Sequence, residues 1–266
     1  MLSVENLSFK YEKKPILENI SLTIPTGKIV GFIGPNGCGK STILKLMANM
    51  LKPQEGTVKL NNNLISKIPN KDLAKKMTLL PQNKQNKMNL TVYELVSFGR
   101  YPHLPWHKRL SENDHKMVDW ALEQTNLSQF KKRRLLTLSG GEAQRAFIAM
   151  ALAQESPLLL LDEPTTFLDI SHQLDVLNLL NSLNKSLNRT IVMVLHDINQ
   201  AVRYCDTIHI FNNNILQNSN DSNQILNSSA IRNAFDIDIR VHYDQINNCP
   251  YGLMDRPSQK YNEKII

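Results

Sequence analysis

A glycine-rich segment near the N-terminus holds the first residues whose types and spacing could do chemistry. Its order of Gly, four residues and then Gly-Lys-Ser is the P-loop spacing. Backbone N–H groups of such a loop turn inward around a phosphate, and the N-terminus of the following helix adds favourable potential. In this pattern the lysine contacts the β- and γ-phosphates, and the serine hydroxyl binds Mg²⁺. The predicted nucleotide-binding residues here are Gly34, Pro35, Asn36, Gly37, Cys38, Gly39, Lys40, Ser41 and Thr42.

Two consecutive carboxylates follow a run of four leucines, where a buried strand would end. The run is Leu158–Leu161, and Asp162 and Glu163 come directly after it. A carboxylate at this point is aimed at Mg²⁺, directly or through water, so we predict that Asp162 binds metal together with Ser41. Glu163 could polarise the attacking water, and a general base is typically worth about 10²–10⁴-fold in rate. The alternative for Glu163 is that it caps the next helix.

Two more polar residues follow predicted strands. His196 comes after the apolar segment 191–195 and could deliver its imidazole to the γ-phosphate. Gln82 comes after a short strand at 77–80, and its amide could reach Mg²⁺ or the water. We therefore predict both as catalytic residues beside Glu163, and Gln82 also as a metal-binding residue. The alternatives are a hydrogen-bonded histidine at a strand end and an ordinary turn glutamine.

A second turn able to bind phosphate lies further along the chain. Leu138, Ser139, Gly140, Gly141 and Glu142 open a stretch with helical spacing of apolar residues. Many loops bind phosphate, so the turn alone is a weak signal. One nucleotide has no evident need of two such turns, which makes their presence in one chain informative.

The elements that must position these residues are visible in the hydrophobic pattern. Alternation at Ile20, Leu22 and Ile24 predicts a half-buried strand, and the apolar segment 28–33 runs straight into the glycine loop. Helical spacing follows over 41–51 and ends before a proline. The short apolar runs at 158–161 and 191–195 predict central strands of a largely parallel sheet, joined by a helix around 174–180.

The middle of the chain has a different character from its two flanks. Helical spacing covers 91–126, is broken by Pro102 and Pro105, and resumes after Gly141. We therefore expect an α/β core with a helical insertion at about 89–154. Beyond residue 211 the chain is rich in Asn and Ser, with a further helix expected at 225–235 and a frayed end at 258–266.

Bulk composition sets limits on the function class. The 266 residues are 41% hydrophobic and 21% charged, and the net charge of +7 permits nucleic acid, an anionic membrane surface or a polyanionic nucleotide as a partner. No run of 18 apolar residues and no signal-peptide pattern is present, so we expect neither a membrane span nor secretion. Cys38, Cys205 and Cys249 show no pairing or metal-ligand spacing, which favours a reducing, cytoplasmic compartment.

Taken together, the motifs resemble the ATPase subunit of ABC transporters over about residues 1–211. The order and spacing of six motifs carry the resemblance: residues 34–41, Gln82, residues 138–142, residues 158–163, Leu168 with Asp169, and His196. It implies a P-loop NTPase core of α/β class with a largely parallel sheet, an N-terminal antiparallel β subdomain and an inserted helical subdomain. The ATPase domain would span 1–240 and a C-terminal tail 241–266, with ATP and Mg²⁺ as cofactors.

The resemblance also assigns roles that spacing alone does not. It implies that Ser139, Gly140 and Gly141 contact the γ-phosphate of ATP held by a second copy, in a head-to-tail homodimer. The family's usual Leu-Ser-Gly-Gly-Gln ends here in Glu142, a common variant. Tyr11 matches the aromatic that stacks on adenine, although it could instead be a strand aromatic in the core. Asp169 matches a dimer-contact loop.

Three segments resemble those of ferric siderophore importers, and haem and cobalamin importers are similar as well. They are residues 98–103, 165–173 and 196–201; Ala143, where related importers often carry a basic residue, departs from the pattern. The expected function is ATP hydrolysis that drives a membrane permease for iron–siderophore uptake, on the cytoplasmic face of the membrane. The permease would contact the segment at 98–103, a solute-binding protein would act indirectly, and no nucleic acid is expected as a partner.

Other classes fit the sequence less well. Soluble ABC ATPases that act on nucleic acid or the ribosome usually carry tandem ATPase domains or a long coiled-coil insertion, and this sequence has neither. A P-loop kinase or GTPase is disfavoured by the Ser-Gly-Gly turn and by the absence of an Asn-Lys-x-Asp segment. The nearer alternatives are a haem, cobalamin or metal-ion importer and, less favoured, an exporter whose ATPase is a separate subunit.

Overall fold

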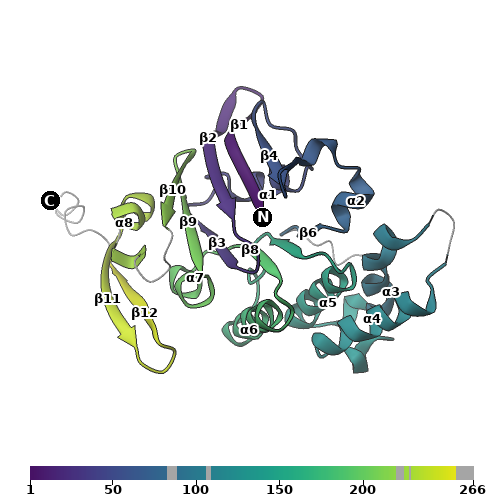
Figure 1. The fold of residues 1–266 in the computed structure, drawn as a ribbon. Helices are drawn as coiled ribbons and strands as arrows, with labels where there is room; N and C mark the ends of the chain where they lie inside the picture. The colour runs from purple at the N-terminus through teal and green to yellow at the C-terminus, as the bar shows by residue number, and fades with distance from the viewer. Residues whose placement is uncertain (83–88, 106–108, 220–224, 228, 256–266) are drawn as a thin grey trace.

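The central element of the fold is a mostly parallel sheet, seen in a computed structural model that describes residues 1–82, 89–105, 109–219, 225–227 and 229–255. Its strand order is β10-β9-β3-β8-β7-β6 (Figure 1). Only the β9–β10 pair is antiparallel among these described strands. The strands are β3 (Ile29–Ile33), β6 (Met77–Leu80), β7 (Leu158–Leu161), β8 (Thr190–Val194), β9 (Thr207–Asn212) and β10 (Ile215–Ser219). The predicted α/β class with a largely parallel sheet is confirmed.

A second, antiparallel sheet is formed by the N-terminal part of the chain. Its order is β2-β1-β4-β5, and its strands are β1 (Leu2–Tyr11), β2 (Lys14–Ile24), β4 (Glu55–Leu60) and β5 (Asn63–Leu64). In β2 the alternation predicted from the sequence is present: Ile20, Leu22 and Ile24 are buried, while the residues between them are exposed. The expected antiparallel β subdomain is therefore confirmed.

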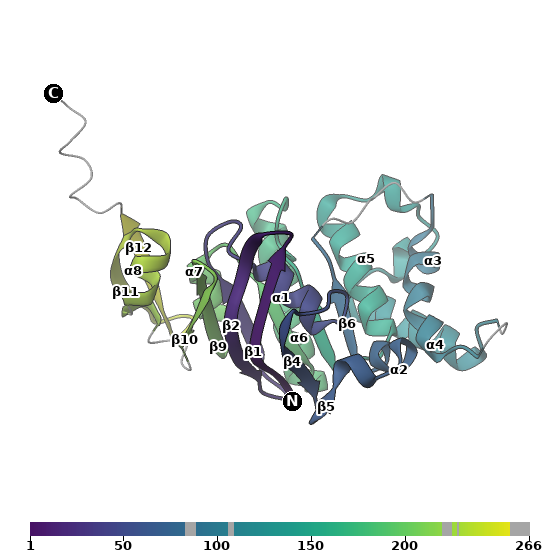
Figure 2. The same ribbon diagram turned by 90° about the horizontal axis from the view of Figure 1, so that it is seen from above.

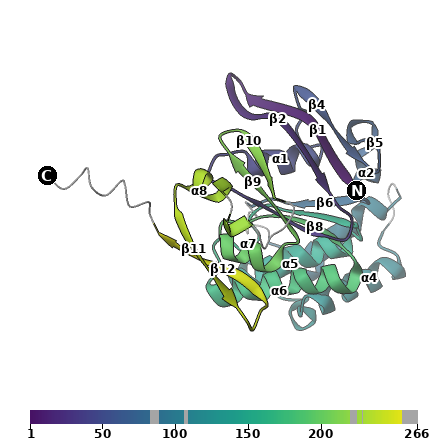
Figure 3. The same ribbon diagram turned by 60° about the vertical axis from the view of Figure 1, so that its left-hand side comes forward.

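Both faces of the parallel sheet are covered, which explains why its central strands are continuous apolar runs. Successive side chains of a strand point to opposite faces. In β7, Leu158 and Leu160 enter one core with α1 (Lys40–Met47) and the antiparallel sheet, and Leu159 and Leu161 enter the other. That second core contains α5 (Gly140–Ala153), α6 (Ile170–Leu187) and α7 (Ile198–Tyr204), which cover the face opposite the antiparallel sheet (Figure 3).

The helical subdomain lies at one end of the molecule (Figure 2). It packs α3 (Val92–Ser97) and α4 (Glu112–Gln124) against α5, and Pro102 lies in the 3₁₀ segment η2 (Phe98–His103) between them. Thr91 and Ser111 cap α3 and α4 by accepting a hydrogen bond from a backbone N–H three residues on. The smaller elements are η1 (Ile65–Lys67), α2 (Asn70–Ala74), η3 (Ser128–Phe130) and η4 (Leu135–Thr137). The inserted helical subdomain expected from the sequence is present.

The opposite end of the molecule is formed by the C-terminal part of the chain (Figure 2). It contains η5 (Ile225–Asn227), α8 (Ser229–Phe235) and the C-terminal hairpin, made of β11 (Asp238–Asp244) and β12 (Cys249–Asp255). Asn199 of α7 donates to Gly252 O (3.1 Å) and accepts from Gly252 N (2.8 Å). The boundary predicted at 240 falls inside β11, and residues 241–255 belong to the C-terminal hairpin, whereas 258–266 lie outside the described residues.

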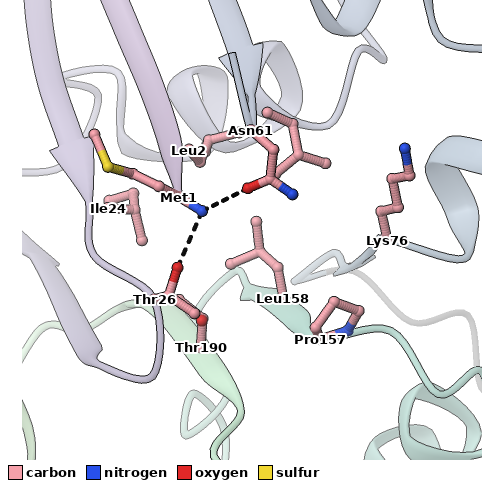
Figure 4. A pocket seen from close by; sticks show the side chains of 10 residues that line it. Met1, Leu2, Ile24, Thr26, Asn61, Lys76, Pro157, Leu158 and Thr190 are labelled. Atoms are coloured by element: carbon pink, nitrogen blue, oxygen red, sulfur yellow. Dashed lines mark hydrogen bonds between the residues drawn. The ribbon is translucent and has the colours of Figure 1, made fainter. Parts of the chain in front are cut away.

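A small cavity lies where the antiparallel sheet meets the N-terminal ends of β7 and β8. It has a volume of about 210 Å³ and is lined in part by Leu158 and Thr190, the first residues of those strands. The N-terminal ammonium of Met1 donates to Thr26 Oγ1 (3.0 Å) and Asn61 Oδ1 (2.8 Å) beside it (Figure 4). The residues predicted to do chemistry follow the other, carboxyl ends of the strands. Among the described residues, no helix is long and apolar enough to cross a bilayer.

Candidate nucleotide-binding site

The predicted site residues follow the carboxyl ends of four neighbouring strands. Residues 34–41, which we call the phosphate loop, follow β3; His196 follows β8; Asp162 and Glu163 follow β7; Gln82 follows β6. These strands are parallel and adjacent in the order β3-β8-β7-β6. Their carboxyl ends therefore meet at one edge of the sheet, which is where ligands bind in open α/β folds.

Two glycines of the phosphate loop occupy positions where a side chain does not fit. Gly34 and Gly39 have φ of 150° and 101°, and few other residues adopt such a backbone. A Cβ on Gly34 would lie 2.2 Å from Phe211 O, and a Cβ on Gly39 would lie 2.7 Å from Leu17 Cδ2. The loop is thus packed closely against β9 and β2, and its backbone is fixed by contacts remote in sequence.

Lys40 begins α1 and extends back into the phosphate loop. Its side chain is buried, and Nζ donates to Gly34 O (2.7 Å) and Pro35 O (2.8 Å). An ammonium held inside a loop at a helix N-terminus is suited to an anionic phosphate. Cys38 Sγ lies 3.7 Å from the same Nζ. Burial raises the pKa of the Cys38 thiol in spite of this neighbouring cation, so the sulfur is a protonated thiol at neutral pH.

Ser41 and Asp162 meet although 121 positions separate them in sequence. Ser41 Oγ donates to Asp162 Oδ1 at 2.8 Å, and Asp162 is buried at the end of β7. Burial raises the pKa of Asp162, the charge of Glu163 raises it further, and the Ser41 hydrogen bond opposes both. A hydroxyl and one carboxylate match the way proteins hold Mg²⁺, which takes few protein oxygens and completes its shell with phosphate and water. The residues present therefore fit a magnesium ion.

Glu163 is the centre of a hydrogen-bonded group at the same edge. Its Oε1 lies 2.8 Å from His196 Nε2, while Oε2 accepts from Thr166 Oγ1 (2.9 Å) and from Gln82 Nε2. The side chain is only 11% exposed, and φ is +52°, a left-handed conformation that costs free energy in a residue other than glycine. Asp169, and not Glu163, caps the next helix, α6. Sequence reasoning assigned no role to Thr166, although it lies three residues after Glu163.

Comparison with known proteins identifies the family. The model of the ABC transporter family matches residues 17–166. This chain belongs to that family. It is 44% identical to an iron(3+)-hydroxamate import ATP-binding protein of Bacillus subtilis, over 95% of this chain and 94% of the relative. It is 43% identical to a petrobactin import ATP-binding protein of Bacillus anthracis, over 99% and 96% of the two chains.

Solved structures agree with this assignment. A chain of an ABC transporter described as metal-chelate type, in an inward-facing conformation, matches with a TM-score of 0.83 and 28% identity, over 98% of each chain. A dimeric ATP-binding cassette in a post-hydrolysis state, bound to ADP and Pi, matches with a TM-score of 0.68 and 30% identity, over 82% of this chain and 98% of that one. The chain is accordingly an ATP-hydrolysing cassette of the ABC family.

In this cassette the Ser-Gly-Gly turn, which is predicted to bind phosphate, opens α5. We call Ser139, Gly140 and Gly141 the signature turn. Ser139 caps the helix: its Oγ accepts from Glu142 N (3.2 Å), and Glu142 Oε2 accepts from Ser139 N (2.8 Å). This reciprocal cap explains physically why glutamate suits the fifth position, since Glu and Gln both make it. The Ser139 backbone hydrogen bond lowers the pKa of Glu142, so this side chain is a carboxylate at neutral pH.

Tyr11, the expected adenine platform, is the last residue of β1. Its ring contacts Phe9 edge-on, with the centroids 4.9 Å apart, and 45% of the residue is exposed. It is therefore not the buried core aromatic that was the alternative. The next strand, β2, packs Leu17 against Gly39 of the phosphate loop, so the hairpin that carries Tyr11 adjoins the loop.

Proposed function

We propose that this cassette is the ATP-hydrolysing subunit of an importer of iron–siderophore complexes, acting as a homodimer on the cytoplasmic face of the membrane. The observation that carries the hydrolytic role is the convergence of Gln82, His196 and Thr166 on Glu163. It lies at the sheet edge that also holds the phosphate loop. A carboxylate fixed by three partners is positioned before substrate arrives, which is what a general base requires.

The phosphates of ATP would bind in the phosphate loop. Lys40 would exchange Gly34 O and Pro35 O for the β- and γ-phosphate oxygens, and Tyr11 would stack on adenine. Ser41, Asp162 and Gln82 would hold Mg²⁺, which neutralises charge that develops on the phosphates. Glu163 would accept a proton from the attacking water, and His196 would hold Glu163 in place and reach the γ-phosphate.

The signature turn would serve ATP bound to a second copy, as in a head-to-tail dimer. Phe167 and Ile170, next to Asp169, are 92% and 77% exposed. Two large apolar side chains this exposed and three positions apart are suited to a protein contact that removes them from water. The solved cassette with a TM-score of 0.68 is itself dimeric and is bound to ADP and Pi. A dimer contact that buries Phe167 and Ile170 would account both for their exposure in the single chain and for the dimeric state of the matched cassette.

The permease would dock on the helical subdomain. An open cavity of about 520 Å³ lies there, lined by Tyr93, Ser97, Phe98, Tyr101, Leu104 and His115 among others. Tyr101 is 58% exposed, whereas Arg100 beside it is buried: Nε contacts Asp114 (2.9 Å) and Nη1 donates to Ala153 O (2.6 Å). Within the expected partner surface at 98–103, Phe98 and Tyr101 therefore line the cavity, and the buried Arg100 holds the segment against α4 and α5.

The proposed cargo rests on the relatives. Several at 41–46% identity are named for import of iron(3+)-hydroxamate or petrobactin, or for transport of achromobactin or ferric enterobactin. The solute itself would contact the permease and an external solute-binding protein and not this subunit. A haem, cobalamin or metal-ion importer is the second candidate, because the description of the matched transporter as metal-chelate type fits these cargoes as well as ferric siderophores.

Uptake in a deletion strain tests the cargo. Cells that lack this gene should lose uptake of ⁵⁵Fe-labelled hydroxamate or catecholate siderophores and keep uptake of haem and cobalamin. A plasmid copy should restore uptake, and a copy with Glu163→Gln should not. Loss of haem or cobalamin uptake alone would reject siderophores as the cargo. Unchanged uptake of all these compounds would reject the importer assignment.

A further inference from the structure

The segment 165–173 contains a histidine to which the proposed hydrolysis gives no role. His172 lies in the first turn of α6, and α6 runs beside α5 (Figures 1 and 3). Its ring lies directly against the signature turn: a Cβ on Gly141 would be 2.1 Å from His172 Cδ2 and 2.7 Å from Cγ. The His172 ring thus leaves no room for even a methyl group at Gly141, and the signature turn packs directly against this ring.

The His172 ring is itself held in a fixed orientation. His172 Nδ1 lies 2.7 Å from Asp169 Oδ1, and the same oxygen accepts from His172 N (2.9 Å) and Ser171 Oγ (2.9 Å). Asp169 therefore caps α6 and orients the ring at once. The His172 ring is held by Asp169 on one side and by Gly141 on the other. Because the ring is fixed in this way, a shift of α6 would be passed on to Gly141.

The first turn of α6 is also connected to the rest of the site. Gln173 Nε2 donates to Leu168 O (3.0 Å), and Gln173 Oε1 accepts from Gln200 Nε2 (2.8 Å). Gln200 N donates to Asp197 Oδ1 (3.0 Å), next to His196. The turn that supports the signature turn is thus bonded both to the loop that follows Glu163 and to the helix that follows His196.

We propose that His172 is a positioning residue that sets the orientation of the signature turn toward the ATP bound by the other subunit. This inference rests on the proposed function, because it takes the signature turn to act across a dimer. His172 touches no reacting atom; it acts through Gly141. The cassette's own loop after Glu163 would thereby be mechanically connected to the site that its partner completes.

The test measures ATP-dependent dimerisation apart from ATP binding. In the full-length chain, Glu163→Gln serves as the background, since it should hold the dimer closed on ATP. His172 is then replaced in two complementary ways: His172→Asn can still bond to Asp169 but lacks the ring, and His172→Phe keeps a flat ring against Gly141 but cannot make the bond. Lys185→Ala, on an exposed position of the same helix, is the matched control.

If the ring supports the signature turn, His172→Asn should raise the protein concentration needed for half dimerisation in ATP by about tenfold or more, in line with the loss of one central contact. ATP affinity of the monomer, measured with a fluorescent analogue at low protein concentration, should be unchanged. With Glu163 intact, kcat should fall by about tenfold or more, because small misplacements cost large factors in rate. His172→Phe should retain most of the dimerisation, and Lys185→Ala all of it.

Equal dimerisation of the His172→Asn and background chains would overturn this inference and leave the proposed function standing. A parallel loss of monomer ATP binding would overturn it as well, because the residue would then support its own subunit's site. If the Glu163→Gln background itself fails to dimerise with ATP, the proposed function fails and the inference with it. Both variants keep a polar or planar side chain at this half-buried position, and a melting curve for each shows whether folding is intact.

Discussion

At the scale of single residues, the site depends on two carboxylates, Asp162 and Glu163, that have the same chemistry but different surroundings. Glu163 and Asp162 are adjacent in sequence and face different partners: Asp162 meets the Ser41 hydroxyl, while Glu163 meets His196, Gln82 and Thr166. One carboxylate is thereby suited to a metal ion and the other to a water molecule. The left-handed backbone at Glu163 is the local strain that permits this divergence.

Glu163→Gln should retain ATP binding and lose turnover by about 10²-fold or more, because the amide keeps the shape of the side chain but cannot accept the proton. The variant should form a persistent dimer in ATP. Phosphate release measures turnover, and size-exclusion chromatography measures the dimer. Glu112→Gln, the same substitution at an exposed position of α4, is the control and should be neutral. Near wild-type hydrolysis by the purified Glu163→Gln protein would remove Glu163 from the role of base.

Alkylation of Cys38 should block ATP binding, and ATP should protect the thiol. Because burial raises the pKa of Cys38, the reactive thiolate is scarce at neutral pH, and the rate of reaction with iodoacetamide should keep rising with pH beyond the point where an ordinary cysteine is fully ionised. Mass spectrometry follows the modification, and a fluorescent nucleotide follows binding. Unchanged ATP binding after confirmed modification of Cys38 would contradict this placement of the thiol in the phosphate loop.

At the scale of elements, buried Arg100 joins the helical subdomain to the core. It bonds to Asp114 of α4, to Ala153 O at the end of α5, and to Glu155 at 2.5 Å in the turn before β7. Burial alone would raise the pKa of Asp114, but hydrogen bonds from Ser111 and Arg100 outweigh it and lower the pKa to about 2. The segment that lines the proposed permease cavity is thus anchored to the turn that leads into β7, the strand that Asp162 follows.

Arg100→Met should lower the free energy of unfolding by about 3–5 kcal/mol, because it leaves the Asp114 carboxylate buried without its charged partner. Urea denaturation at pH 7 measures the loss, with Lys116→Met on the exposed face of α4 as the control. The folded pKa of Asp114 is depressed, so its contribution is fully present above about pH 4 and is lost as pH falls toward 2. Asp114→Asn should remove that part of the acid dependence; an unchanged acid transition would contradict the pair.

At the scale of the whole molecule, the two turns predicted to bind phosphate lie on different subdomains. The phosphate loop belongs to the sheet core, and the signature turn begins a helix that packs with the helical subdomain. If the signature turn of one copy completes the site at the phosphate loop of the other, a lone cassette holds ATP but hydrolyses it slowly. Specific activity should then rise with protein concentration until the dimer is saturated.

Ser139→Arg should abolish turnover and transport while ATP binding to the isolated subunit stays intact. Arginine at the start of α5 would fill the space that the partner's γ-phosphate needs and would remove the serine cap, which alone costs about 1 kcal/mol of stability. Equilibrium binding of labelled ATP at low protein concentration and steady-state hydrolysis separate the two effects. Loss of ATP binding by the monomer would show that the signature turn serves its own subunit.

The sequence by itself determined the features that are encoded locally. The P-loop spacing, the carboxylates at the end of a leucine run and the period-2 alternation of β2 depend on residues within a few positions of one another, and each was predicted in place. The C-terminal hairpin carries a comparable signal, with Ile239, Val241 and Tyr243 alternating before an Asn-rich turn, although the predicted tail begins at residue 241, inside this hairpin.

Only the tertiary structure decided which of these segments meet. Gln82 and Glu163 are 81 positions apart, Arg100 and Ala153 are 53 apart, and the His172 ring excludes any side chain at Gly141 on another helix. Such contacts depend on strand order and helix packing, which are set by burial over the whole core. They produce no periodic pattern in the sequence of either segment that takes part in the contact. The sequence therefore specified the groups able to do chemistry, and the packing of the sheet and its helices brought them together.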